Sequence, residues 1–167
     1  MKFNKAIKNL FIVLFSTLLI SACSTAKKAN VDTANDVYTG TDTVEFLAKG
    51  VPDRIFFATN KSSLTTASRD TLRKQATWMR KNKNVTVTVE GHADERGTRE
   101  YNLALGERRA NAAKDYLMTY GVSGKRISVI SYGKERPVNP ASSPLAWSQN
   151  RRSVSYTHLT LPTKRIV

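Results

Sequence analysis

Cysteine is almost absent from this sequence: among 167 residues only Cys23 carries a thiol, so no intramolecular disulfide can form. The chain also shows no Ser-His-Asp arrangement, no glycine-rich phosphate loop and no carboxylate pair of convincing spacing. His92 and Asp94 could suggest a metal pair, but two ligands without a third are weak evidence, and exposed loop residues are the more common explanation. We therefore expect a protein that is not an enzyme and that holds no metal or cofactor.

Acidic residues are also scarce, at 13 against 27 lysines and arginines, which gives a formal net charge of +14. Five of the basic residues lie in an N-terminal leader and a doubtful C-terminal tail; 27 less 5 leaves 22 basic residues against the same 13 acids. Such an excess favours polyanions or acidic surfaces as partners, or it is a general aid to solubility. Because the leader indicates export, we expect no nucleic acid partner.

The chain has no apolar run long enough to cross a bilayer. Its longest, LFIVLFSTLLI at residues 10–20, is shorter than the roughly 20 residues that a membrane span requires. With three lysines before it, the run is typical of a signal peptide covering residues 1–22. The run ends in ISAC, which resembles the bacterial lipoprotein box and implies lipidation of Cys23 at an exposed mature N-terminus; a conventional signal peptide with a chance cysteine is the alternative. Ser24 follows instead of aspartate, which by the same resemblance favours the outer membrane.

The rest of the chain divides into three parts. Residues 23–43 are rich in small polar residues and are predicted to form the lipidated N-terminus and a flexible tether. Residues 44–153 are predicted to form one folded domain. Residues 154–167, VSYTHLTLPTKRIV, do not continue its pattern and resemble the conceptual translation of a transposase adapter used in sequencing libraries. We interpret them as a non-native tail, with an unusual natural C-terminus as the alternative.

Within the domain, apolar runs alternate with helical spacing. We predict strands at residues 54–57, 85–90, 127–132 and 152–154, helices at 64–83 and 98–120, and a helical turn or two at 144–152 that leads into the last strand. Thr65 or Thr66 is the predicted N-cap of the first helix, and Gly121 is placed to end the second. This order predicts an α+β fold, a sandwich of two or three helices on one mixed sheet.

Residues 85–117 form a strand-loop-helix unit around which the domain is organised. The strand alternates valine with polar residues, and the loop at 91–98 is dense in charge and bounded by glycines. The helix is expected to bury a stripe of Tyr101, Leu105, Ala112, Tyr116 and Tyr120. The unit brings Asp94 of the loop near Arg108 and Arg109 of the helix.

The residues of this unit suit a ligand that carries both an ammonium and a carboxylate. An aspartate can hold an ammonium, and an arginine can pair with a carboxylate through two parallel hydrogen bonds. The candidate residues are His92, Asp94, Arg96, Asn102, Arg108 and Arg109. Asn102 precedes Arg109 by seven residues, about two turns, so both point roughly the same way. The alternatives are that Asp94 caps the helix beginning near Thr98 and that Arg109 lies on a solvated helix face.

Four motifs resemble the signature of the OmpA-like peptidoglycan-binding domain: GHADERGT at 91–98, LGERRAN at 105–111, SVISYGK at 128–134 and NRR at 150–152. The wording of the first two is closest to the group of peptidoglycan-associated lipoproteins. The resemblance implies a β-α-β-α-β fold. It also implies non-covalent binding to the peptide stem of peptidoglycan at diaminopimelate.

Carried over by motif, Asp94 would hold the ammonium of diaminopimelate, Arg109 its carboxylate, and Asn102 would support the pocket. In this family, the loop after the first strand supplies backbone contacts to the ligand. Here that loop position is occupied by Thr59 and Asn60, where the family usually has Phe-Asp. The implied partners are peptidoglycan, TolB and other Tol proteins. The implied role is to tie the outer membrane to the cell wall, with a part in envelope integrity and cell division.

Two rival interpretations remain open from the sequence. An anchored wall-remodelling hydrolase would need a metal or nucleophile constellation, which the sequence does not offer. A lipid-anchored adaptor would take a periplasmic Tol protein as its main ligand and the wall as a secondary one. It predicts that loss of Arg109 leaves function in cells mostly intact.

Overall fold

The computed structural model describes residues 31–32, 36–43 and 45–158. The predicted signal peptide, the lipidation site Cys23 and most of the tether lie outside the described residues, as do residues 159–167 of the tail. Within the described ranges, no helix combines the length and the hydrophobicity that a membrane span requires.

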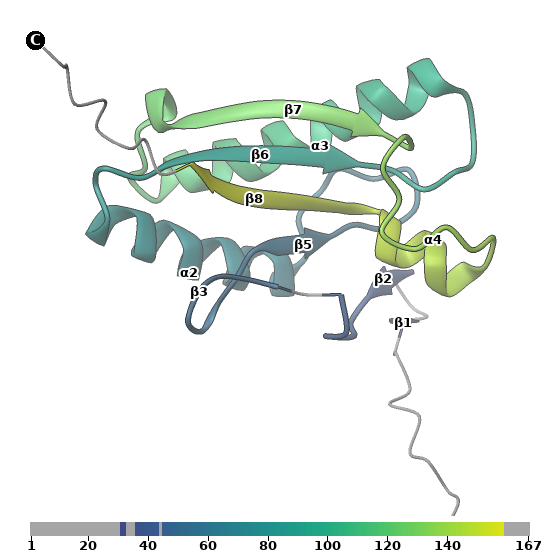
Figure 1. The fold of residues 1–167 in the computed structure, drawn as a ribbon, viewed down its shortest axis with the longest axis horizontal. Coiled ribbons are helices and arrows are strands. Elements are labelled where there is room, and N and C mark those ends of the chain that lie inside the picture. Colours follow the sequence, from purple (N-terminus) through teal and green to yellow (C-terminus); the bar gives the residue numbers. More distant parts are fainter. Residues whose placement is uncertain (1–30, 33–35, 44, 159–167) are drawn as a thin grey trace, which may run out of the picture.

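A four-stranded sheet forms the centre of the molecule (Figure 1). Its strands are β5 (Arg54–Phe56), β8 (Arg152–His158), β6 (Thr86–His92) and β7 (Ile127–Gly133), in that spatial order. The pairing of β6 with β7 is parallel, whereas β8 is antiparallel to both of its neighbours. The sheet is therefore mixed, as the sequence predicts.

Two short two-stranded ladders precede this sheet, and the sequence patterns did not predict either one. The first joins β1 (Val31–Asp32) to β2 (Val37–Tyr38), and the second joins β3 (Phe46–Ala48) to β4 (Val51–Pro52). Segments of two or three residues are too short to show a period of hydrophobicity.

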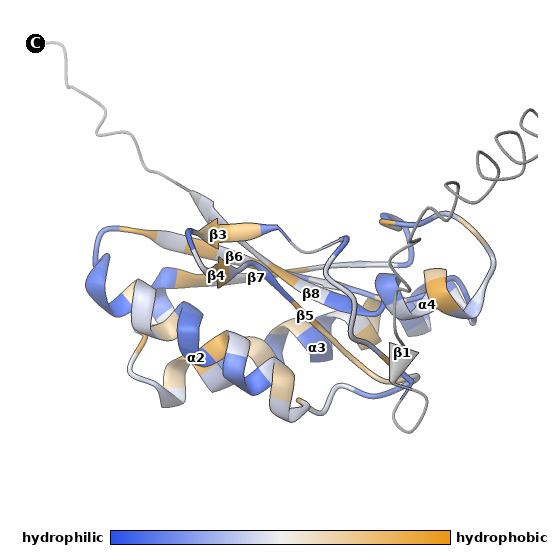
Figure 2. Cartoon of the chain, turned by 90° about the horizontal axis from the view of Figure 1, so that it is seen from below, coloured by the Kyte–Doolittle hydropathy of each residue, from blue (hydrophilic) through white to orange (hydrophobic). Residues whose placement is uncertain are grey.

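Helices α2 (Thr66–Lys81) and α3 (Arg99–Thr119) cover one face of the sheet (Figure 2). Thr65 and Thr98 are their N-caps, and each side chain accepts a hydrogen bond from the backbone N–H three residues later. Gly121 follows α3 with φ of 81°, the left-handed conformation that glycine adopts at no steric cost. A short turn η1 (Gly124–Arg126) precedes β7, and α4 (Pro144–Asn150) precedes β8. The predicted α+β sandwich is confirmed.

The core lies between the sheet and the two long helices. Val87 and Val89 of β6 point into it, as the alternation of valine in this strand predicts. The buried apolar side chains are Ile55, Phe57, Leu72, Ala76, Met79, Val87, Val89, Ala110, Ala113, Leu117, Val122 and Ile127. This core holds the sheet and both helices as one unit.

The predicted buried stripe of α3 is partly wrong. Tyr101 is 43 % exposed, and Tyr116 and Tyr120 only border the core. The buried face consists of Asn102, Leu105, Gly106, Arg109, Ala110, Ala113 and Leu117. Because it contains an amide, a guanidinium and several small residues, hydropathy does not distinguish it from the exposed face.

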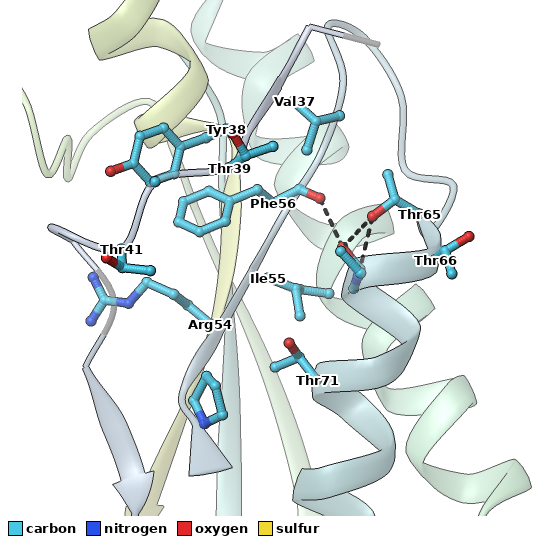
Figure 3. Close-up of a pocket in the computed structure, with 14 residues that line it drawn as sticks. Val37, Tyr38, Thr39, Thr41, Arg54, Ile55, Phe56, Thr65, Thr66 and Thr71 are labelled. Atoms are coloured by element: carbon cyan, nitrogen blue, oxygen red, sulfur yellow. Dashed lines mark hydrogen bonds between the residues drawn. The ribbon is translucent and has the colours of Figure 1, made fainter. Parts of the chain in front are cut away.

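The folded part extends beyond the predicted limits of 44 and 153. Before residue 44, Tyr38 packs edge-on against Phe56 with ring centroids 4.7 Å apart (Figure 3). After residue 153, β8 continues to His158, and Val154 is only 1 % exposed. The predicted boundary at Ser153 therefore falls inside a strand, whose ladder bonds come from the backbone and depend little on the side chains. The non-native origin of residues 154–167 stays a prediction.

Candidate functional site

The candidate site lies at one end of the sheet, where α3 crosses β6 at very close range. A Cβ on Gly91 would lie 1.8 Å from the carbonyl oxygen of Gly106, and a Cβ on Gly106 would lie 2.8 Å from the carbonyl oxygen of Gly91. Only two glycines allow this approach. Asn102 and Arg109 lie about one turn on either side of the crossing, so both are pressed toward the end of β6 and the loop that follows it.

Arg109 is fully buried, with no exposed surface. Its Nε donates to the carbonyl of Lys61 at 2.9 Å, its Nη1 to that of His92 at 2.8 Å and its Nη2 to that of Ala58 at 3.0 Å. No ion pair of Arg109 is found in the part of the chain that the structure describes. Burial, followed by the charge of Arg151, lowers the pKa of Arg109 to about 9. The alternative of a solvated helix face is therefore wrong.

Asp94 is 7 % exposed and is held by two arginines. Its Oδ1 accepts from the backbone N–H of Arg96 at 3.1 Å and from Arg96 Nε at 3.0 Å. Its Oδ2 accepts from Arg96 Nη2 at 2.7 Å and from Arg151 Nη1 at 3.2 Å. Burial alone raises the pKa of Asp94, but these hydrogen bonds outweigh it and hold the pKa below its usual value. The helix cap is Thr98, so the alternative role of Asp94 as the cap is wrong.

Arg96 covers the site from the solvent side. Its side chain, 42 % exposed, lies over the ring of Trp147 at 4.4 Å, and its Nη2 donates to Thr59 Oγ1 at 3.3 Å. Asn102 is buried and donates from Nδ2 to the carbonyl of Arg96 at 2.8 Å, which steadies the loop. As the seven-residue spacing predicts, Asn102 and Arg109 share one face of α3.

The loop after β5 contributes to the site through its backbone, and Thr59 also contributes its side chain. The Thr59 hydroxyl accepts from Arg96 and donates to a carboxylate oxygen of Asp36. Asn60 is exposed and adopts φ of 55°, a left-handed turn conformation that asparagine tolerates. Arg108 is not part of the site: it is exposed and its guanidinium lies 6.0 Å from the ring of Tyr101.

Arg151 and Asp36 are members of the site that the sequence analysis missed. Arg151 is 1 % exposed at its side chain, and it bridges Asp94 to Asp36 Oδ1, the latter at 2.8 Å from its Nη2. Its Nε donates to the carbonyl of Phe57 at 3.1 Å. The NRR motif was the only available signal for Arg151. Asp36 had none, because it lies in a segment whose composition predicts a tether.

The charges of the site do not balance. Two carboxylates, Asp36 and Asp94, face three guanidiniums, those of Arg96, Arg109 and Arg151. Asp94 and Arg109 interact electrostatically but form no ion pair. An acidic group and an uncompensated cation therefore lie close together without contact. This arrangement can bind a ligand that carries opposite charges at the same spacing.

His92 is buried, at 1 % exposed, which contradicts the expectation of an exposed loop residue. Burial, followed by the charges of Arg152, Arg136 and Arg54, lowers its pKa to about 3. A carboxylate oxygen of Glu90 lies 3.4 Å from its Nε2, but this proximity does not offset the burial and the three arginines. Among the described residues, no three His, Cys, Asp or Glu side chains are grouped as a metal site requires.

Comparison with known proteins identifies relatives of the whole domain. The OmpA family matches residues 56–151. A peptidoglycan-associated lipoprotein of Rhizobium meliloti (strain 1021) is 47 % identical over 148 residues, which cover 86 % of this chain and 84 % of the relative. Such relatives are lipoproteins and not enzymes, so the expectation of a non-catalytic protein is confirmed.

Solved structures agree with this relationship. The crystal structure of the peptidoglycan-associated lipoprotein from Burkholderia pseudomallei superposes with a TM-score of 0.62 at 32 % identity and covers 64 % of this chain and 90 % of that one. The C-terminal domain of Helicobacter pylori MotB, at 23 % identity and a TM-score of 0.60, covers 64 % of this chain and 84 % of that one; it shows the shared fold alone. By its motifs, its fold and these matches, the chain belongs to the OmpA family.

Proposed function

We propose that this protein binds peptidoglycan non-covalently by holding the diaminopimelate of the peptide stem between Asp94 and Arg109. The observation that supports this proposal most is the state of Arg109. It is a fully buried cation held by three backbone carbonyls, without an ion pair among the described residues and close to an acid that it does not contact. Burying a charge without a counterion is costly, and a ligand carboxylate would relieve that cost.

The proposed binding event exchanges charges within the site. The guanidinium of Arg109 has five N–H donors and uses three of them for backbone carbonyls. The ligand carboxylate accepts hydrogen bonds from the remaining donors. The ligand ammonium takes the place of the Arg96 guanidinium on Asp94. Arg96 is partly exposed and can turn toward solvent, whereas Arg109 has no exposed surface, so a ligand reaches it only after residues that cover it move. No bond is made or broken.

The wider role that we propose is attachment of the outer membrane to the cell wall. The lipid on Cys23 would anchor the protein in the outer membrane, and the domain would reach the wall from the periplasm. Many tethered copies facing one polymer gain effective concentration, so a modest affinity at each site suffices. TolB and other Tol proteins are proposed as further partners, which would connect the protein to envelope integrity and cell division.

The test is sedimentation of the full-length protein, kept in detergent, with purified cell-wall sacculi. Walls that contain diaminopimelate are compared with walls that contain lysine in its place. The variants are Asp94→Asn and Arg109→Met. The matched control is Arg108→Met, which removes the same charge from the adjacent, exposed position of α3.

We expect the wild type and Arg108→Met to sediment with the diaminopimelate wall only. Both site variants should lose at least about tenfold in affinity, since each removes one half of a charge-assisted contact. Circular dichroism must show that the variants remain folded. Equal binding to both walls, or binding that survives both substitutions, would contradict the proposal and favour the adaptor interpretation.

A further inference from the structure

A groove of about 650 Å³ lies beside the candidate site. Its walls come from Asp36 and Val37, from the loop after β5 and from the first turn of α2. Thr59 lines the groove and also binds Arg96, so the groove adjoins the Asp94 end of the site. Ala58 and Lys61, whose backbone carbonyls hold Arg109, also line the groove. A ligand seated between Asp94 and Arg109 is therefore next to this groove.

The groove carries positive charge without internal compensation. Lys61 and Arg69 both line it and both are exposed, and neither forms an ion pair with any residue that the structure describes. The one acid among its described lining residues, Asp36, is engaged by Arg151 and by the hydroxyl of Thr59. Two cations are thus available to a ligand in the groove.

A second hollow nearby lacks this property. It has a volume of about 480 Å³ and shares Val37, Thr65 and Thr66 with the groove (Figure 3). Among the described residues that line it, only Arg54 is charged, and its Nε and Nη2 both donate to the Asp53 carboxylate at 2.8 Å. Unpaired charge therefore distinguishes the groove from the hollow beside it.

We propose that Lys61 and Arg69 form a second subsite, which takes the carboxylate of an acidic residue in the same peptide that presents the zwitterionic residue to Asp94 and Arg109. This inference rests on the proposed function and extends it from one residue to a peptide of defined charge. An exposed ion pair changes affinity by about two- to fivefold, so the two cations together distinguish an acidic from a neutral peptide by about tenfold.

Calorimetric titration of the full-length protein in detergent tests the subsite with three probes. The first is free diaminopimelic acid. The second is a synthetic peptide in which glutamate is joined to one amino group of diaminopimelate, and the third is its glutamine counterpart. The test variant combines Lys61→Met with Arg69→Met. The control is Lys74→Met, which removes a cation from the exposed face of α2 outside the groove.

We expect the wild type and the control to bind the glutamate peptide about tenfold more tightly than the glutamine peptide. The double variant should lose this preference. Arg69→Met alone, at a residue that contacts neither Asp94 nor Arg109, should weaken the preference and keep the affinity for free diaminopimelic acid within about twofold. A preference that survives the double variant, or a wild type without one, would overturn the subsite alone. Failure of the wild type to bind any probe would instead refute the proposed function, and the subsite with it.

Discussion

Arg109 shows how a single residue can combine a structural and a recognition role. Its guanidinium ties two backbone segments to α3, because it donates to two carbonyls of the loop after β5 and to one at the end of β6. The same burial that fixes its position lowers its pKa, and no residue that the structure describes forms an ion pair with it. The planar guanidinium is essential to this arrangement, because its N–H groups point in several directions and reach all three carbonyls. A lysine ammonium is compact and cannot reach all three at once.

The substitution Arg109→Lys should therefore destabilise the domain although it keeps the charge. A lysine can reach one of the three carbonyls and leaves the others without a donor, so we expect a loss of about 1–3 kcal/mol in the free energy of unfolding. Urea denaturation of the full-length protein measures it. Arg108→Lys, on the exposed position next to it, should change stability by less than about 0.5 kcal/mol. Equal stabilities of the two variants would show that the carbonyl contacts contribute nothing.

His92 predicts a dependence of stability on pH. Its pKa is about 3 in the folded protein and 6.5 when unperturbed, so between these values the unfolded chain binds more protons. The stability that neutral His92 contributes is fully present above pH 6.5 and is lost as the pH falls toward 3. The slope reaches at most about 1.4 kcal/mol per pH unit for one group.

The variant His92→Phe, which cannot titrate, isolates this contribution. We expect its free energy of unfolding to fall less steeply than that of the wild type between pH 6.5 and 3 when both are measured by urea denaturation. Carboxylates contribute equally to both curves, so the difference belongs to His92. Parallel curves would mean that His92 is protonated without cost in the folded state.

Among the elements, the crossing of α3 over β6 controls the geometry of the site. The helix reaches the strand only because Gly91 and Gly106 bring two backbones together. Asn102 and Arg109 flank this contact, so the distance between helix and strand sets the position of Arg109 relative to the Asp94 loop.

Gly91→Ala should therefore affect both stability and binding. The new methyl would overlap the backbone of α3 at Gly106, and we expect a loss of at least about 2 kcal/mol, at the upper end of the cost of overpacking. Wall binding should fall with it. The control is Gly124→Ala, where the Cβ would meet the flexible side chain of Met118 at 3.2 Å. Thermal unfolding measures the stability of both variants, and sedimentation with sacculi measures their wall binding. If Gly91→Ala behaves like Gly124→Ala in both experiments, α3 does not cross β6 as closely as described.

The position of β8 makes a second prediction at the scale of elements. Residues 154–158 of this strand pair with residues 86–90 of β6, in the middle of the sheet. A chain that stops after Ser153 loses these pairings, and we expect it to show no cooperative unfolding transition. A chain that stops after His158 keeps every pairing of the strand and should unfold as the full-length protein does. A cooperative transition in the shorter chain would mean that the sheet tolerates loss of this segment.

At the scale of the whole molecule, binding of an acidic polymer has two components. One is the attraction of the exposed basic residues, and the other is the contact with the buried Arg109. At physiological ionic strength, salt screens the interactions of exposed charges beyond about 8 Å. Arg109 is buried and is screened much less. The two components are therefore separable by salt.

We expect a rise in salt from about 0.05 M to about 0.5 M to abolish the residual wall binding of Arg109→Met. The wild type should keep most of its binding over the same range, as measured by the sedimented fraction. If salt reduces the wall binding of the wild type and of Arg109→Met to the same extent, general charge attraction is responsible for wall binding.

Much of the fold was predictable because its signals are local. The valine alternation of β6, the spacing of α2 and the cap at Thr65 each depend on a few neighbouring residues, and the structure has all three. The buried face of α3 was predicted only in part. Its Asn102 and Arg109 are polar, and nothing in their hydropathy indicates that they lie inside.

For the site, sequence motifs identified Asp94, Asn102 and Arg109, and the structure brings these three to one end of the sheet. Their ligand roles stay predictions, as do those of Thr59 and Asn60. Asp36 and Arg151 were missed because their contact spans residues 115 positions apart.

The sequence by itself determined the order of the α-helices and strands from β5 to β8, the N-cap of α2, the alternation of the central strand and the presence of an acid, an amide and arginines on one strand-loop-helix unit. These features arise from interactions over a few residues. Only the tertiary structure decided that Arg109 is buried without an ion pair to any described residue, that Arg96 and Arg151 bind Asp94, and that β8 lies between β5 and β6. These depend on how distant segments pack, and packing decides which charges lose their water and which backbones come within hydrogen-bond distance.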